Sequence, residues 1–399
     1  MKRLFLIFTA LICFLGVSFA QKKVISQART YVKSGKELAK AEKLMTDLLK
    51  DSANRTNEKV WLTLFEAVKK QYEQGNEKLY LKQKYDTASL FTTARKMFTI
   101  LEAFDSLDAR PNKKGEVELK YRDKHAEFLN TYRPNLYNAG SYHLRKMNFQ
   151  EAYTYFDSYI DCAGQPLFEK YKYSDNDTLL APAAFYALYA GYRLRDAQKV
   201  FKYQTLAEGD SVRLDNIIQY LAETHLMLKD TATYVRELRR GFDNSPSHPF
   251  FFPRLIDYYN GRGEIDTAMV FIDRALATDS ASQLYLFAKS SALLNTGRYD
   301  ECIDVTQKLL ALNDSLPEAN CNMGLAYYNK ALQLGKTTQR GRKNRRATNE
   351  MYEKARPYME KYRQMAPEQK AKWLPALYTI YLNLNMGKEF EEIDRLRGQ

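Results

Sequence analysis

A run of positively charged residues is the densest group in the sequence whose side chains could bind a ligand by charge. It holds six cations and no acidic residue, at Lys336, Arg340, Arg342, Lys343, Arg345 and Arg346. Clustered cations attract anions, so this run could bind an anionic membrane surface, a polyanionic glycan or an acidic protein. The alternative interpretation is a solvated surface loop that repulsion between like charges keeps extended.

Other spacing patterns do not indicate catalysis or cofactor binding. The tripeptide at 335–337 resembles the end of a phosphate-binding loop, but Lys330 stands where that motif requires glycine. The histidines, at positions 125, 143, 225 and 248, lack the spacing of metal ligands. No serine or cysteine lies in a nucleophile motif. We therefore expect no enzyme activity, no cofactor, no metal and no nucleotide site.

Composition favours a globular protein built from long helices. The chain has 399 residues, of which 45% are hydrophobic and 27% are charged. It has only 17 glycines and 11 prolines, which leaves room for uninterrupted helices and argues against a loop-rich β-sandwich or barrel. Lysine and arginine (61) exceed aspartate and glutamate (48), giving a net charge of +13.

The N-terminal 20 residues have the pattern of a secretory signal. Two basic residues at 2–3 precede an apolar run at 4–17, and Ala20 ends a small-residue cleavage site. We expect cleavage after Ala20 and a periplasmic location, which argues against nucleic acid as a partner. Cys13 lies inside the apolar run, so a lipoprotein is not expected. The three later cysteines fit buried single thiols better than a disulfide framework.

The elements that would position these residues are helices in pairs. In the segment 250–279, a first apolar stripe has helical spacing, a Gly-Arg-Gly break follows, and a second stripe begins. Each stripe is too narrow to form a core alone, so the pair must stack on its neighbours. The stripes are Phe252, Leu255, Ile256 and Tyr259, and then Ile265, Ala268, Ile272, Ala275 and Leu276.

The same plan recurs with a period of 34 residues, for example from Ala268 to Cys302. Gly140 and Ala152 fit the same positions in 136–162, and Gly324 begins another unit. These positions resemble the tetratricopeptide repeat (TPR). The resemblance implies an all-α, right-handed superhelix of stacked antiparallel helix pairs. Stretches at 80–88 and 373–378 are similar to uncharacterised exported bacterial TPR-containing proteins, a likeness that brings no established activity.

The repeat signal varies along the chain and suggests three parts. Residues 1–20 form the signal segment, 21–133 form irregular TPR-like helices, and 134–399 form the array, with a basic insertion at 335–349 between two helices. The interval from Ala41 to Ala94 exceeds one repeat, and we expect it to lengthen helices, with residues 80–107 helical throughout.

The TPR register places one set of residues in the concave groove that first helices line. The Lys and Asn with which some TPR proteins clamp a carboxylate are absent from the matching positions, and the groove is instead apolar and aromatic. Leu284, Leu294, Leu325 and Glu318 also fall in this register, and packing under adjoining helices is the alternative for the three leucines. The remaining candidates are Phe250, Asp257, Asn260, Phe287, Ser291, Asn295, Cys321, Tyr328, Asn329, Tyr378 and Tyr381.

These features predict a non-enzymatic, exported scaffold that binds a helix or extended segment of a protein partner through apolar anchors. The rival interpretation is a module that binds an anionic membrane surface or glycan through the basic insertion. An enzyme whose site is distributed among helices is the third interpretation.

Overall fold

The computed structural model describes residues 21–336 and 342–397, with only the backbone described for 342–344. These residues form helices and turns without a strand. None of the described helices is long and apolar enough to cross a membrane. The predicted signal segment lies outside the described residues. The chain divides into two compact units, Met1–Thr224 and His225–Gln399, which are described separately. The predicted boundary at residue 133 stays a prediction.

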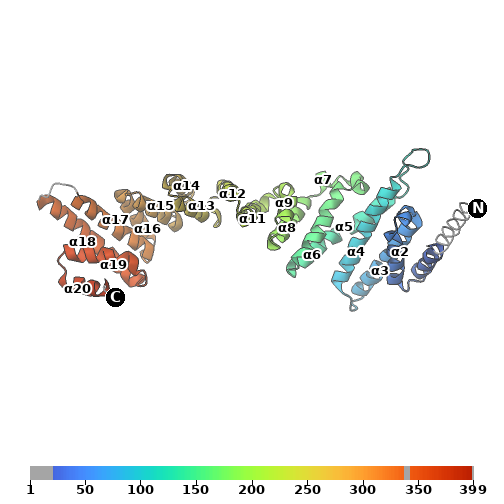
Figure 1. Cartoon of the computed structure of the whole chain (residues 1–399), viewed down its shortest axis with the longest axis horizontal. Coiled ribbons are helices and arrows are strands. Elements are labelled where there is room, and N and C mark those ends of the chain that lie inside the picture. Colours follow the sequence, from blue (N-terminus) through green and yellow to red (C-terminus); the bar gives the residue numbers. More distant parts are fainter. Residues whose placement is uncertain (1–20, 337–341, 398–399) are drawn as a thin grey trace, which may run out of the picture. The chain divides into compact units, whose positions relative to one another are not determined.

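Unit 1 is an array of helices in which α2 to α6 each pack on the next, and α6, α9 and α10 pack on α8 (Figure 1). Residues 21–34 are helical and precede the labelled elements. Short 3-10 turns separate several of the helices. The helices are α2 (Leu38–Lys50), α3 (Glu58–Tyr80), α4 (Thr87–Asp108), α5 (Arg122–Arg145), α6 (Phe149–Asp161), α7 (Tyr173–Asn176), α8 (Leu180–Arg193), α9 (Ala197–Lys202), α10 (Gln204–Ala207) and α11 (Leu214–Met227), the last ending just past the boundary.

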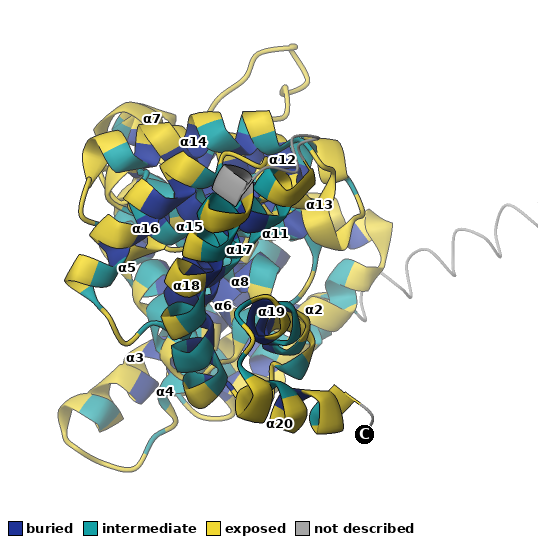
Figure 2. Ribbon diagram, turned by 90° about the vertical axis from the view of Figure 1, so that its left-hand side faces the viewer, coloured by how far each residue is buried: buried dark blue, intermediate teal, exposed yellow. Residues whose placement is uncertain are grey.

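Unit 2 continues the same plan with more regular pairs. Consecutive helices pack on one another. Some first helices also contact the first helix of the next pair: α15 contacts α17, and α17 contacts α19. Figure 2 shows exposed residues over most of α20, whose one buried residue is Ile393. The helices are α12 (Thr231–Asn244), α13 (Phe251–Gly261), α14 (Ile265–Thr278), α15 (Gln283–Asn295), α16 (Tyr299–Leu312), α17 (Pro317–Lys336), α18 (Arg342–Met365), α19 (Lys370–Asn383) and α20 (Gly387–Arg397).

The repeat period is visible in where second helices begin. α9, α12, α14 and α16 begin at intervals of 34 residues. The residue two positions before each start has a left-handed backbone, with φ between 56° and 73°. In the sequence only two of these four turn residues are glycine. They are Arg195, Lys229, Gly263 and Gly297. The expected all-α array of TPR-like helix pairs is therefore confirmed, on spacing and backbone geometry, within the units.

Glycine permits the close approach of two helices in two of the pairs. A Cβ built on Gly140 would lie 2.7 Å from the ring of Phe156 on the partner helix α6. On Gly324 it would lie 2.5 Å from Sδ of Met359 on α18. Distances this short exclude any larger residue without displacement of the neighbour, so both glycines set the separation of their helix pair.

Two features differ from the sequence-based expectation. The prediction that residues 80–107 are helical throughout is wrong, because α3 ends at Tyr80 and α4 begins at Thr87. Asp86 caps the new helix by accepting hydrogen bonds from the backbone N–H groups of Ala88 and Ser89. The expected lengthening does occur, since α3 has 23 residues and α4 has 22.

The basic segment 335–349 is also more helical than the expected insertion. Residues 335–336 end α17, and residues 342–349 begin α18. Arginine and lysine are good helix formers, so a charged run does not by itself end a helix. The long α17 and α18, of 20 and 24 residues, pack along one another.

Candidate partner-binding site

An apolar pocket lies between the N-terminal parts of the first helices α15 and α17. Its volume is about 210 Å³. Three of its lining residues, Leu284, Phe287 and Glu318, belong to the predicted groove register. Leu284 and Glu318 occupy the same position in consecutive repeats. We call this cavity the α15–α17 pocket, and its lining is Gln283, Leu284, Phe287, Leu316, Glu318 and Ala319.

Residues of α16 pack against the walls of the α15–α17 pocket. Phe287 and Leu316 are half-buried and pack, with the buried Ala319, in a cluster that includes Leu309 and Leu310 of α16. Leu284 differs, because 48% of its surface is exposed. The pocket therefore has fixed apolar walls and one exposed apolar residue at its mouth.

Hydrogen bonds fix the two helices that form the pocket. The side-chain amide of Asn322 on α17 donates to the hydroxyls of Ser290 and Ser291 on α15, at 2.8 and 3.0 Å. Asn320 donates to the backbone carbonyls of Asp314 and Leu316, which holds the turn that places Leu316 in the pocket wall. Buried polar groups that are satisfied in this way restrict helices to one relative position.

The rim of the pocket is polar on two sides. Glu318 is exposed in the first turn of α17, where the helix dipole favours a negative charge. Gln283 is exposed at the start of α15, and its side-chain oxygen accepts a hydrogen bond from Asn313 at 3.3 Å. The pocket can therefore hold an apolar side chain while its rim offers an anion and an amide donor.

The structure places the other predicted groove residues in three environments. Asp257, Asn260 and Asn295 are exposed. Ser291, Tyr328, Asn329 and Tyr378 are half-buried. Phe250, Cys321 and Tyr381 are buried and make internal contacts. Of the eleven candidate groove residues, only Phe287 lines the α15–α17 pocket, so the structure does not gather the predicted set at one cavity.

The three buried candidates have clear packing roles. The ring of Phe250 lies under the Arg254 guanidinium, 3.9 Å from its centre. The hydroxyl of Tyr381 donates to Glu360 at 3.0 Å. Cys321 lies in the core cluster of α17, α18 and α19, and burial raises the pKa of its thiol to about 11. Contact with a partner would thus depend on the more exposed members of the set.

Tyrosines connect the far end of the first-helix face to α19. The hydroxyl of Tyr328 on α17 lies 3.4 Å from that of Thr379 on α19. The ring of Tyr378 packs on Phe390 at 4.9 Å, and the Arg397 guanidinium lies 4.7 Å from its centre. Both tyrosines keep part of their surface exposed.

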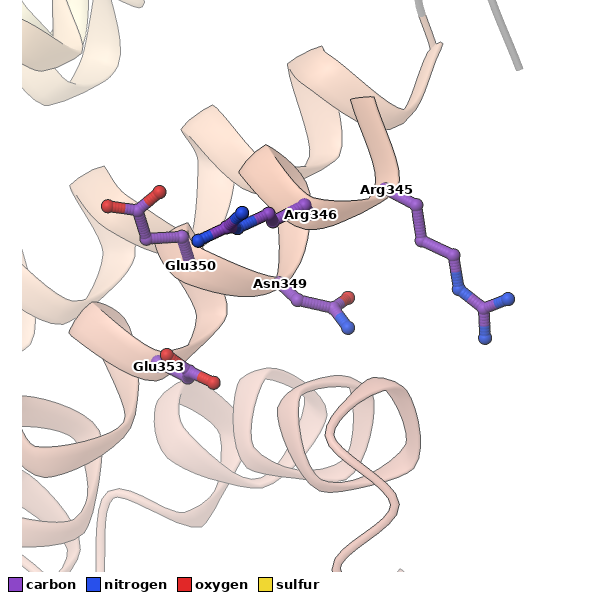
Figure 3. Close-up of a pocket in the computed structure, with 5 residues that line it drawn as sticks. All are labelled: Arg345, Arg346, Asn349, Glu350 and Glu353. Carbon is purple, nitrogen blue, oxygen red and sulfur yellow. The ribbon is translucent and has the colours of Figure 1, made fainter. Parts of the chain in front are cut away.

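The basic run contributes to a second, wide cavity on α18. Figure 3 shows its lining, with Arg345 extending away from the other side chains. Arg345 and Arg346 are exposed, but Glu350 and Glu353 line the same cavity, whose volume is about 630 Å³. The two arginines are thus accompanied by two carboxylates, which reduces the local positive charge.

The remaining cations of the run are only partly described. Lys336 is exposed at the end of α17. Arg340 lies outside the described residues, and for Arg342 and Lys343 only the backbone is described.

Sequence reasoning missed several residues of the site. Leu316 and Ala319 flank the start of α17, and their proximity to α15 depends on how the two helices cross. Asn322 and Ser290 carried no signal, since isolated polar residues in helices are common. The hydrophobic residue at 316, followed by Pro317 at the helix start, is the one local signal that could have indicated an ordered entry turn.

The three cysteines of the described chain are buried free thiols, in line with the sequence-based expectation. No group of three or more histidine, cysteine, aspartate or glutamate residues that could hold a metal ion occurs in residues 21–336 and 342–397.

Comparison with known proteins gives only distant likenesses. No protein-family model and no curated protein matches the chain. Among solved structures, the C-terminal part of a TPR repeat-containing protein from Cytophaga hutchinsonii is 11% identical, over 64% of this chain and 92% of that one, with a TM-score of 0.42.

Two other solved structures are similar to the chain with lower TM-scores. The human IFIT1 dimer with m7Gppp-AAAA is 13% identical, over 78% of this chain and 72% of that one, with a TM-score of 0.36. A TPR repeats protein from Bacteroides fragilis is 11% identical, over 66% and 98%, with a TM-score of 0.29. At this level of likeness the neighbours assign no ligand to the present chain.

Proposed function

We propose that this chain is an exported, non-enzymatic scaffold that binds a segment of a protein partner at the α15–α17 pocket. The observation that carries the proposal is the pocket itself, an apolar cavity with braced walls on consecutive first helices. Such cavities hold the anchor side chains that supply most of the affinity in peptide recognition.

The dimensions of the site support a short segment as the ligand. A cavity of about 210 Å³ suits one branched or aromatic side chain rather than a cofactor. The half-buried tyrosines 328 and 378 lie on α17 and α19, further along the first helices, and would extend the contact beyond a single anchor. Affinity from such anchors would depend little on salt.

The proposal is tested with the mature chain, residues 21–399, as bait for a display library of random dodecapeptides. The affinity of the selected peptides is then measured by fluorescence polarisation. Leu284→Ser and Phe287→Ala should each weaken binding about tenfold or more, because each removes apolar wall from the pocket.

The control is Val270→Ala, which truncates an exposed apolar residue on the second helix α14 and should leave binding unchanged. Leu284→Ser keeps the test valid if Phe287→Ala perturbs the fold, since Leu284 is largely exposed. Selected peptides that bind both pocket variants with full affinity would remove the pocket from the proposal.

Export is part of the proposal and has its own test. The N-terminal sequence of the protein recovered from the periplasm of the producing cell should begin at Gln21. Recovery of the full-length chain in the cytoplasm would contradict it.

Binding to an anionic membrane or glycan is the second candidate function. The exposed side chains of Arg345 and Arg346 favour it, while the carboxylates of Glu350 and Glu353 in the same cavity oppose it. We therefore rank it below peptide binding.

A further inference from the structure

We infer that the segment bound at the α15–α17 pocket carries a lysine or arginine next to its apolar anchor. The inference rests on the proposed function and adds the charge of the ligand. It is carried by the position and environment of one carboxylate, that of Glu318, which lies beside the apolar cavity.

Glu318 is exposed and has no cation within ion-pair distance among the described residues. Several acidic residues of these repeats are paired, although Asp257, Asp266 and Asp304 form no ion pair among the described residues. Asp273 pairs with Lys289 at 2.8 Å, Asp300 with Lys330, and Asp314 with Lys361 at 3.4 Å. What distinguishes Glu318 from the other unpaired carboxylates is its position in the lining of an apolar pocket, where a bound segment would come close to it.

Lys372, on the neighbouring helix α19, is a cation in the surroundings of Glu318. Lys372 on α19 and Glu318 act in opposite directions on the pKa of the Cys321 thiol, so both lie near it. Lys372 nevertheless forms no ion pair with Glu318 in the described structure. The exposed Glu318 carboxylate is therefore left to pair with a cation of the ligand.

Gln283 gives the ligand a second polar contact. Because Asn313 donates to the side-chain oxygen of Gln283, the NH₂ group of Gln283 is oriented toward other acceptors. A backbone carbonyl of an extended segment is such an acceptor.

These contacts define one binding arrangement. An apolar side chain enters between Leu284, Phe287 and Leu316, a backbone carbonyl accepts from Gln283, and a neighbouring lysine or arginine pairs with Glu318. An acidic segment would be repelled by the same carboxylate, so the rim selects by charge while the cavity supplies affinity.

The experiment compares three baits against the dodecapeptide display library: the wild-type mature chain, Glu318→Lys and Glu350→Lys. The last variant makes the same charge change at an exposed carboxylate on α18, away from the α15–α17 pocket. The wild type and Glu350→Lys should select leucine, isoleucine or methionine flanked by lysine or arginine. Glu318→Lys should select the same anchors flanked by aspartate or glutamate.

Affinities of synthetic peptides quantify the effect. Replacing the flanking lysine of a selected peptide by glutamate should weaken binding to the wild type about three- to tenfold, as expected for an exposed pair changed to a repulsion. The same replacement should strengthen binding to Glu318→Lys.

The possible failures are distinguishable. If the wild type selects apolar peptides without a basic preference, or if Glu318→Lys keeps that preference, the inference is overturned and the proposed function stands. Equal loss of the preference in Glu350→Lys would also overturn it. If the wild type selects no peptide, the proposed function fails and the inference falls with it.

Discussion

The side-chain amide of Asn322 on α17 donates a hydrogen bond of 2.8 Å to the hydroxyl of Ser290 on α15. Ser290 is fully buried and Asn322 is 8% exposed. The Ser290 hydroxyl in turn donates to the backbone carbonyl of Phe287 at 3.0 Å. These two hydrogen bonds connect the contact between α15 and α17 to the backbone of Phe287, a residue that lines the α15–α17 pocket.

Asn322→Ala should lower the free energy of unfolding by about 1–3 kcal/mol, because it leaves the buried hydroxyl of Ser290 without its donor. The measurement is urea denaturation followed by circular dichroism. Peptide affinity should also fall, since α15 and α17 would lose hydrogen bonds that fix their relative position at the pocket.

Asn329→Ala is the matched control on the same helix. Its side chain is half-buried, and the change should stay within about 0.5 kcal/mol. Equal destabilisation by both variants would show that the Asn322 bond has no special role.

Two glycines of α17 should respond oppositely to alanine. A Cβ at Gly324 would lie 2.5 Å from Sδ and 3.2 Å from the backbone nitrogen of Met359, so Gly324→Ala should destabilise by about 1–3 kcal/mol. A Cβ at Gly335 would meet nothing within 4 Å. There, alanine should stabilise by up to about 1 kcal/mol through its higher helix propensity.

Thermal denaturation of the two variants decides this prediction. A Gly324→Ala protein as stable as the wild type would show that α17 and α18 can separate without cost, contrary to the close crossing that the glycine permits.

The stability of the protein should fall as pH rises from about 4.5 to about 7 because of Glu102. Burial, followed by the nearby Asp161, raises the pKa of the Glu102 carboxyl from 4.5 to about 7. The folded state therefore binds a proton that the unfolded state has already released in this interval, and this contribution to stability is lost as pH rises.

Glu102→Gln should remove that component and should stabilise the protein at pH 8 by about 1–3 kcal/mol relative to the wild type. Glu127→Gln, at an exposed site on α5, should not. The measurement is the difference in unfolding free energy between variant and wild type at a series of pH values, which cancels the titration of other groups. A pH-independent difference for Glu102→Gln would contradict the prediction.

Replacing Arg342, Lys343, Arg345 and Arg346 by glutamine should abolish any retention of the chain on phosphatidylserine vesicles at low salt. The interaction expected from exposed cations is weak and screened by salt. Glu350→Gln with Glu353→Gln should instead strengthen retention, because these carboxylates share the cavity of two of the arginines.

Vesicle sedimentation at low and near-physiological salt measures both effects. Retention that persists at high salt, or that survives the fourfold replacement, would exclude the basic run as its cause. Phosphatidylcholine vesicles provide the uncharged comparison.

The helix class and the repeat could be predicted because they depend on local spacing of apolar residues. The stripes at 252–259 and 265–276 fall within α13 and α14. The prediction of a continuous helix at 80–107 was wrong because it was based on apolar residues alone. The polar side chain of Asp86, which caps the start of α4, is not part of that pattern. Lys82, with φ 55°, adopts a conformation that its residue type does not signal.

The site was less predictable because it depends on which side chains meet between helices. Leu284, Phe287 and Glu318, which the register assigned to the groove, line one pocket. It also assigned Phe250 and Tyr381 to the groove, and both are buried by neighbours that the register does not include. Burial at these positions is decided by the size and tilt of adjoining helices, which a 34-residue period alone does not encode.

The left-handed backbone conformation of Arg195 and Lys229 bears on how the sequence of such a repeat can diverge. Each occupies a conformation that glycine adopts at no steric cost at the equivalent Gly263 and Gly297. The turn is thus imposed by the helices on either side of it, which tolerate the strain of a larger residue. A residue other than glycine can therefore replace glycine at such a turn while the 34-residue spacing of the second helices is kept. The spacing would then still reveal a common repeat after the turn sequences have diverged.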